Sequence, residues 1–224
     1  GPQVADDRLR TLVAHERALR GETIPVAEVD VHVLEVPIAL QAWEPDYTLA
    51  AYRSDRADFP EREVPDLVWS ELPDAVLREP EDDAAEALLA LTEPWTSQSN
   101  GRSEAVAVAG TAEEAIRTLG PHRVRSAEIN LGDALALMAW TGASGGAYSR
   151  RRGSPVGRML TWWALAGLLG MDDVDEPDLL GAEAATLRCV LGDPGDQIGG
   201  WSFHLAVEDS EDGLAWAVSA VDAV

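Results

Sequence analysis

Arginines gather at one point of the sequence, directly before its most apolar helical stretch, in the segment 142–170. The cluster comprises Arg150, Arg151, Arg152 and Arg158. A helix N-terminus presents unpaired N–H groups and a partial positive charge, which favour an anion. Together with the hydroxyl of Ser154, the arginines therefore predict a site for a phosphate or carboxylate. The alternative is that they form ion pairs with the many acidic side chains around them.

A serine in the preceding loop suggests a different chemistry. Residues 142–146 match the pattern G-x-S-x-G, in which Ser144 would be a nucleophile on a sharp strand-to-helix turn. Asp193 or Asp196 and then His204 follow in the chain order that such hydrolases use. The residues before Ser144 predict a helix instead of a strand, however, so the structural context for this chemistry is missing.

His204 is the best candidate for a general acid or base. Strict alternation over 201–208 predicts a strand that places His204 on the face opposite the large apolar side chains. Arg188, Glu208 and Ser219 are predicted to share that face, and an imidazole beside such groups can transfer protons. The alternative is a solvated face, which antiparallel sheets commonly have.

Neither a metal site nor a nucleotide cofactor is expected. The histidines, at positions 15, 32, 122 and 204, have no HxH or HExxH spacing, and Cys189 is the single cysteine. No GxGxxG or Walker A segment is present.

The composition is acidic, with a formal net charge of −23, and all 17 basic residues are arginine. Such a charge repels phosphate backbones and anionic lipids, so we expect no binding to nucleic acid or membranes. The negative charge serves either to keep the protein soluble or to attract a basic protein partner to its surface.

Three observations bear on location. The longest apolar run, 159–171, is shorter than the roughly 20 residues that cross a bilayer. The first ten residues lack the charged and apolar regions of a secretory signal, and Gly1-Pro2 resembles a protease-cleavage scar. We therefore expect a cytoplasmic protein.

Apolar periodicity and capping signals predict the elements that must position these residues. Helices are expected at 5–20, 81–91, from Thr111 to Gly120, 131–140 and 154–169, and strands at 29–33, 103–109, 124–129, 186–191, 201–208 and 214–221. The proline-rich segment 43–80 is expected to be mostly irregular.

Local signals sharpen two of the helices. Thr111 and Glu114 fit a capping box, and Ser154 with Pro155 fits the N-cap and first position of the next helix, which Gly170 would end. In that helix Trp162 and Trp163 cannot face the same way, so one should fill the core and the other contact a sheet or a pocket wall.

These elements predict a single α+β domain over residues 1–224. A buried helical hairpin, 131–140 and 154–169, packs on a mixed sheet that ends in a C-terminal three-stranded antiparallel meander. The strand, short helix and strand of 103–129 form a βαβ-like unit, and the N-terminal third wraps the core.

The C-terminal half resembles a family of uncharacterised actinobacterial proteins over roughly residues 100–224. The resemblance rests on Gly145 to Tyr148, Arg150 to Gly153, Trp162 to Ala166, Leu205 to Asp209 and Gly213 to Trp216. It implies a bacterial, cytoplasmic setting and makes the Gly/Arg loop a family feature, but it implies no substrate.

Two main functions remain open. The first is a cofactor-independent enzyme or ligand-binding protein of bacterial specialised metabolism, which holds an anionic small molecule with the arginine cluster and uses His204 as acid or base. The second is a non-catalytic acidic protein, such as an immunity or accessory factor, that binds a basic protein. A serine hydrolase acting through Ser144 is a third.

Overall fold

The computed structural model describes most of the chain. The described residues are 2–25, 30, 32–54, 57–58, 65–79, 82–148, 150–171, 174–195 and 200–222.

A six-stranded sheet forms the centre of the molecule, and every pair of neighbouring strands in it is antiparallel. The strand order is β3-β5-β6-β7-β8-β4. Its strands are β3 (Val68–Glu71), β4 (Arg102–Ala109), β5 (Arg123–Ile129), β6 (Arg188–Asp193), β7 (Trp201–Asp209) and β8 (Leu214–Asp222). A separate two-stranded ribbon consists of β1 (Ala51–Tyr52) and β2 (Ala57–Asp58).

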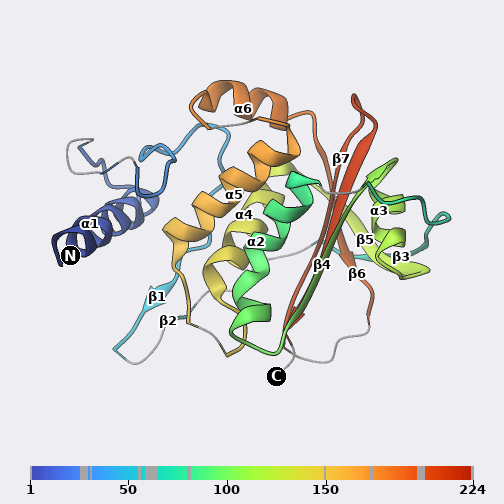
Figure 1. The fold of residues 1–224 in the computed structure, drawn as a ribbon, viewed down its shortest axis with the longest axis horizontal. Helices are drawn as coiled ribbons and strands as arrows, with labels where there is room; N and C mark the ends of the chain where they lie inside the picture. Colours follow the sequence, from blue (N-terminus) through green and yellow to red (C-terminus); the bar gives the residue numbers. More distant parts are fainter. Residues whose placement is uncertain are drawn as a thin grey trace.

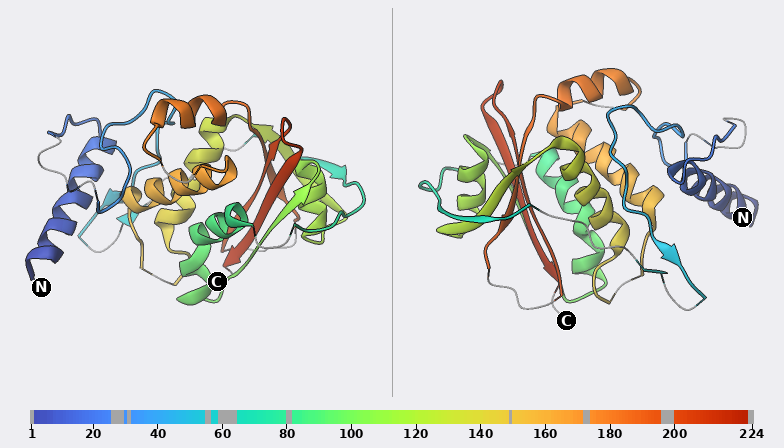
Figure 2. Two further views of the ribbon diagram at one scale, coloured as in Figure 1. Left: turned by 45° about the horizontal axis from the view of Figure 1, so that its top comes forward. Right: turned by 180° about the vertical axis from the view of Figure 1, so that it is seen from behind.

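Helices cover the two faces of this sheet unequally, as Figure 1 shows with the sheet seen edge-on. Three helices, α2 (Asp83–Ser97), α4 (Leu131–Ser144) and α5 (Ser154–Leu168), lie on one face, and α3 (Ala112–Thr118) lies on the other (Figures 1 and 2). The short α6 (Pro177–Ala184) adjoins α5, and α1 (Pro2–Leu19) packs on α5 at the end of the molecule farthest from the sheet.

Period-2 alternation in the strands divides the core into two layers. Phe203, Leu205 and Val207 of β7 belong to the large core beneath α2, α4 and α5. Ala206 belongs to a smaller core beneath α3. The alternation predicted for this strand is therefore confirmed, and His204 lies on the α3 side together with Ala206.

The predicted α+β class and the C-terminal meander β6-β7-β8 are confirmed. The prediction of a mixed sheet is wrong in detail. β4 and β5 do run in the same direction, as the βαβ-like pattern implied, but the three meander strands lie between them. The parallel strand pair that the prediction required is therefore absent, and all neighbouring strands of this sheet are antiparallel.

Several local predictions also differ from the structure. For the strand expected at 29–33, positions 29 and 31 lie outside the described residues, and residues 32–34 form a turn. The segment 43–80 contains the short strands β1, β2 and β3, and α6, for which no helix was predicted, begins at the end of the acidic stretch 171–178. Ser154 is the first residue of α5, and Gly153 (φ 91°) takes the N-cap position without a capping side chain.

The helices of the described part of the chain include none that is long and apolar enough to cross a membrane.

Candidate functional site

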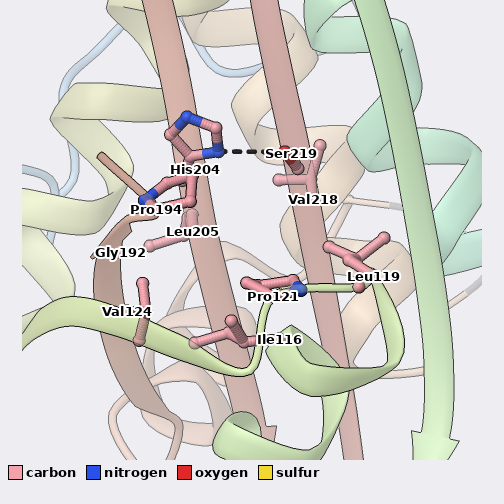
Figure 3. Close-up of a pocket in the computed structure, with 11 residues that line it drawn as sticks. Ile116, Leu119, Pro121, Val124, Gly192, Pro194, His204, Leu205, Val218 and Ser219 are labelled. Atoms are coloured by element: carbon pink, nitrogen blue, oxygen red, sulfur yellow. Dashed lines mark hydrogen bonds between the residues drawn. The ribbon is translucent and has the colours of Figure 1, made fainter. Parts of the chain in front are cut away.

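A cavity of about 290 Å³ lies between the end of α3 and the sheet. Figure 3 shows it, with His204 and Ser219 above Pro121 and Leu119. The walls are mostly apolar and come from the end of α3, the loop after it, and strands of the sheet. They are formed by Ile116, Leu119, Gly120, Pro121, Val124, Gly192, Pro194, His204, Leu205, Val218 and Ser219.

The position of the α3 wall follows from local sequence. The hydroxyl of Thr111 accepts a hydrogen bond from Glu114 N, and Thr111 N donates to the Glu114 carboxylate at 2.8 Å, so the predicted capping box is confirmed. After α3 the chain reverses through Gly120, whose φ of 126° strongly favours glycine. Pro121 follows and leads into β5, which closes the cavity at Val124.

Two polar side chains face each other in this apolar surrounding. His204 and Ser219 are directly opposite on β7 and β8, and Nδ1 of His204 lies 3.0 Å from Oγ of Ser219. When the serine donates, the imidazole carries its proton on Nε2; when Nδ1 donates, Nε2 is basic. In both cases Nδ1 is engaged by Ser219.

A second compartment of about 240 Å³ continues the cavity. It shares Leu119, Pro194, His204 and Ser219 with the first. It adds Arg102, Ser103, Glu104 and Val221 from the ends of β4 and β8. Glu104 lies opposite Ser219, and its carboxylate is 2.6 Å from the Arg78 guanidinium. We call the two compartments together the His204 cleft; one end is mainly apolar, and the other is lined by Arg102, Glu104 and His204.

Arg188 and Glu208 share the sheet face of His204, as predicted, but they lie near the other end of β7. Arg188 is bound by three carboxylates, those of Glu113 (2.6 Å), Glu128 (2.9 Å) and Glu208 (2.9 Å). The hydrogen bond that Arg188 donates to Glu113, followed by those it donates to the other two acids, raises the arginine pKa despite its partial burial. The same contact lowers the pKa of Glu113. This group is a structural ion cluster that joins α3 to the sheet.

Arg158 of the arginine cluster is buried and fully engaged. Its side chain is 1% exposed, and its guanidinium is 2.6 Å from the equally buried Glu44 carboxylate. It also donates to the carbonyl oxygens of Pro37 (2.6 Å) and Ala39 (3.2 Å). Arg158 therefore links α5 to the segment 37–44, and these contacts leave its guanidinium turned away from any ligand.

Two other arginines of the cluster also have partners within the protein. Arg152 forms an ion pair with Glu93, and Arg151 lies over the Trp201 ring at 5.3 Å from its centre. Arg150 is exposed, whereas Ser154 is buried and its hydroxyl has no hydrogen-bond partner among the described residues. Of the two alternatives that the sequence left open, the structure favours ion pairing for Arg152 and Arg158.

Ser144 is the last residue of α4 and is completely buried. Its hydroxyl donates to the carbonyl of Thr141 at 2.9 Å. Of its proposed partners, Asp193 pairs with Arg125, and Asp196 lies outside the described residues. Ser144 thus occupies a helix end instead of a strand-to-helix turn.

Sequence reasoning placed His204 and Ser219 on one face but missed the rest of the cleft. Arg102, Leu119 and Pro121 come from separate elements, and only the Gly120-Pro121 turn and the alternation of β4 pointed towards them. Cys189 is buried, and burial, with Glu128 nearby, raises the pKa of its thiol to about 12, so it is a poor nucleophile at neutral pH. Within the described residues, no three His, Cys, Asp or Glu side chains are grouped to hold a metal ion.

A family of unknown function (DUF6183) matches residues 1–190, and the chain belongs to it. The match includes the N-terminal third, which lay outside the predicted resemblance, and it ends before β7 and β8. No curated protein and no solved structure matches the chain.

Proposed function

We propose that this protein binds a small molecule with an apolar body and an anionic group in the His204 cleft. The observation that carries the proposal is the hydrogen-bonded His204–Ser219 pair on the wall of a cavity that is otherwise mainly apolar. Small-molecule sites typically combine such an apolar lining with a few placed polar groups.

Each of the two compartments would contact a different part of the ligand. Ile116, Leu119 and Val124 would contact the apolar body, and the cavity of about 290 Å³ lies near the lower limit of volumes that hold small ligands. Arg102 and His204 in the adjoining compartment would hold a carboxylate. The Glu104 carboxylate would repel the ligand carboxylate only weakly, because Glu104 forms an ion pair with Arg78.

The proposal keeps the anionic ligand expected from the sequence but moves its site away from the arginine cluster. In an enzyme built on this cleft, His204 would be the general acid or base, with its ring held in place by the hydrogen bond to Ser219. An actinobacterial origin and a cytoplasmic location are further parts of the proposal, supported by the resemblance. A role in specialised metabolism is also part of the proposal, but the resemblance implies no substrate.

Binding can be tested by NMR with named probes. Benzoate, 4-phenylbutyrate and indole-3-acetate are titrated into protein labelled at histidine side chains and at Leu and Ile methyl groups. We expect saturable shifts at His204, Leu119 and Ile116 for at least one probe. Leu119→Trp, which fills the cavity, and Arg102→Gln should each weaken that binding by about tenfold or more, the loss of one good contact.

The matched control is Leu9→Trp, because Leu9 is 59% exposed and lies on α1, at the end of the molecule farthest from the sheet. It should leave binding unchanged. Absence of any saturable shift at millimolar probe, or equal effects of Leu119→Trp and Leu9→Trp in folded protein, would refute the proposal.

A further inference from the structure

A second cavity, of about 540 Å³, lies on the helical side of the sheet. It is bounded by the segment 32–37, by α5, and by the chain entering α6. Its lining consists of His32, Glu35, Val36, Pro37, Trp163, Val174, Asp175 and Pro177. We call it the Trp163 groove. The His204 cleft lies on the opposite face of the sheet, so the two sites are independent.

Trp163 supplies an aromatic wall that the core does not need. Its neighbour Trp162 is fully buried, packs at a tilt against Trp43 and donates to Glu44 at 2.9 Å. Adjacent residues on a helix point about 100° apart, so Trp163 faces outward and is only partly buried. The expectation that one tryptophan fills the core while the other contacts a pocket wall is confirmed.

Carboxylates stand at the rim of this groove. Glu35 and Asp175 both line it and are exposed. Leu34 and Val36, on either side of Glu35, are 3% and 7% exposed, so the backbone that carries Glu35 is anchored in the core. In the part of the chain that the structure describes, no ion pair joins Glu35 to an arginine. The next acids along the chain, Glu176 and Asp178, are exposed as well.

An indole wall flanked by carboxylates matches the chemistry of a guanidinium group. Arginine stacks flat on tryptophan and forms two parallel hydrogen bonds with a carboxylate, whereas lysine is a more strongly hydrated point charge. Buried Val36 and Val174 offer apolar surface to the methylene groups of the same side chain.

We propose that the Trp163 groove receives an arginine side chain from a basic protein partner. The net charge of −23 supports a protein partner, because it steers a basic surface towards the whole molecule before the groove selects one side chain. An anionic small molecule would face the exposed Glu35 carboxylate and would be repelled.

The test uses the acetylated, amidated peptide Gly-Arg-Gly-Arg-Gly and its lysine counterpart, titrated calorimetrically and followed at the Trp163 indole N–H by NMR. We expect the arginine peptide to bind more tightly than the lysine peptide and to shift the Trp163 signal. Trp163→Leu should weaken binding by about 3- to 30-fold, the range of a cation–π contact. Glu35→Gln should weaken it by about 3- to 10-fold, as an exposed charge-assisted hydrogen bond does.

Glu211→Gln is the matched control, since it removes one negative charge in the exposed turn between β7 and β8. It should change binding by less than about twofold, because salt screens charges more than about 10 Å away. Equal losses in Glu35→Gln and Glu211→Gln would show general charge attraction and overturn the site. Equally tight binding of Nα-acetylarginine amide would overturn the protein partner, and no shift at Trp163 would overturn the groove itself.

Discussion

His15, on α1, shares a buried environment with the Arg158–Glu44 ion pair. It is 2% exposed, and its Nδ1 has no hydrogen-bond partner among the described residues. Burial, and then the positive charge of Arg158, lower the pKa of His15 to about 4, although Glu44 acts in the opposite direction. The folded protein therefore holds His15 neutral at pH values where an unfolded chain would protonate it.

This predicts a specific loss of stability in mild acid. Above pH 6.5 His15 is neutral in both states and has no effect. Between pH 6.5 and about 4 the unfolded chain binds the proton first, so the free energy of unfolding falls as the pH falls. From pH 7 to pH 5 we expect a loss of about 2 kcal/mol from this residue, measured by urea unfolding.

His15→Gln should flatten this part of the pH profile, whereas His122→Gln, at an exposed position, should not. The carboxyl group of Glu44 affects the free energy of unfolding over a different pH range. Burial alone would raise its pKa, but hydrogen bonds from Arg158, Tyr47 and Gln41 bring it below the ordinary value, so its contribution is lost only below about pH 4.5. An unchanged slope between pH 7 and 5 in His15→Gln would contradict the assignment.

The local sequence pattern did not predict which side chains the arginines of the cluster contact. Arg158 looked like a ligand-binding residue because it follows three other arginines at a helix N-terminus. Its partner, Glu44, lies 114 residues away and becomes a neighbour only when the chain folds. His204 and Ser219 were predicted to share a face because period-2 alternation needs only local sequence.

Among the helices, α4 and α5 form the closest pair because glycine lies at their contact. A Cβ atom placed on Gly157 would overlap the carbonyl oxygen of Ala139 and lie 2.9 Å from the Cβ of Ala143. Gly167, in the same helix, has room: a Cβ there would lie 3.4 Å or more from Ala84 and Ala87 of α2.

We therefore expect opposite effects from the same substitution at two positions of α5. Gly157→Ala should destabilise the protein by about 1–3 kcal/mol, because the backbones of α4 and α5 must separate. Gly167→Ala should be neutral or stabilise by up to about 1 kcal/mol, through the better helix propensity of alanine. Chemical unfolding of both variants measures the difference, and similar values for the two would show that the contact with Ala139 relaxes freely.

The elements that the sequence predicted best carry their signal locally. The capping box of α3 and the alternation of β7 and β8 each involve a few adjacent residues, and both are present as expected. β3 was not predicted because its sequence has no apolar alternation. It is an edge strand, and all of its residues are exposed. α6 escaped because its first turn lies in an acidic run that is typical of a loop. The cavity against α3 is lined by four separate stretches of the chain, so no local sequence pattern predicts it.

At the scale of the whole molecule, charge is the property that acts everywhere at once. Acidic residues number 40 and basic residues 17, and the arginines described above are largely engaged in ion pairs. The remaining carboxylates repel one another across the surface, which disfavours the compact state. Salt screens these interactions over a distance of about 8–10 Å at physiological ionic strength.

Salt should therefore stabilise this protein, although it weakens the exposed ion pairs. Raising NaCl from 20 to 300 mM at pH 7.5 should increase Tm by about 2–4 °C, which corresponds to roughly 1 kcal/mol for a chain of this size. At pH 4.5, close to the sequence pI of about 4.3, the same step should leave Tm nearly unchanged, because the repulsion is gone. A fall in Tm at pH 7.5 would mean that the ion pairs around Arg188, Arg152 and Arg78 outweigh the net repulsion, and that the acidic surface contributes no long-range force to attract a basic partner.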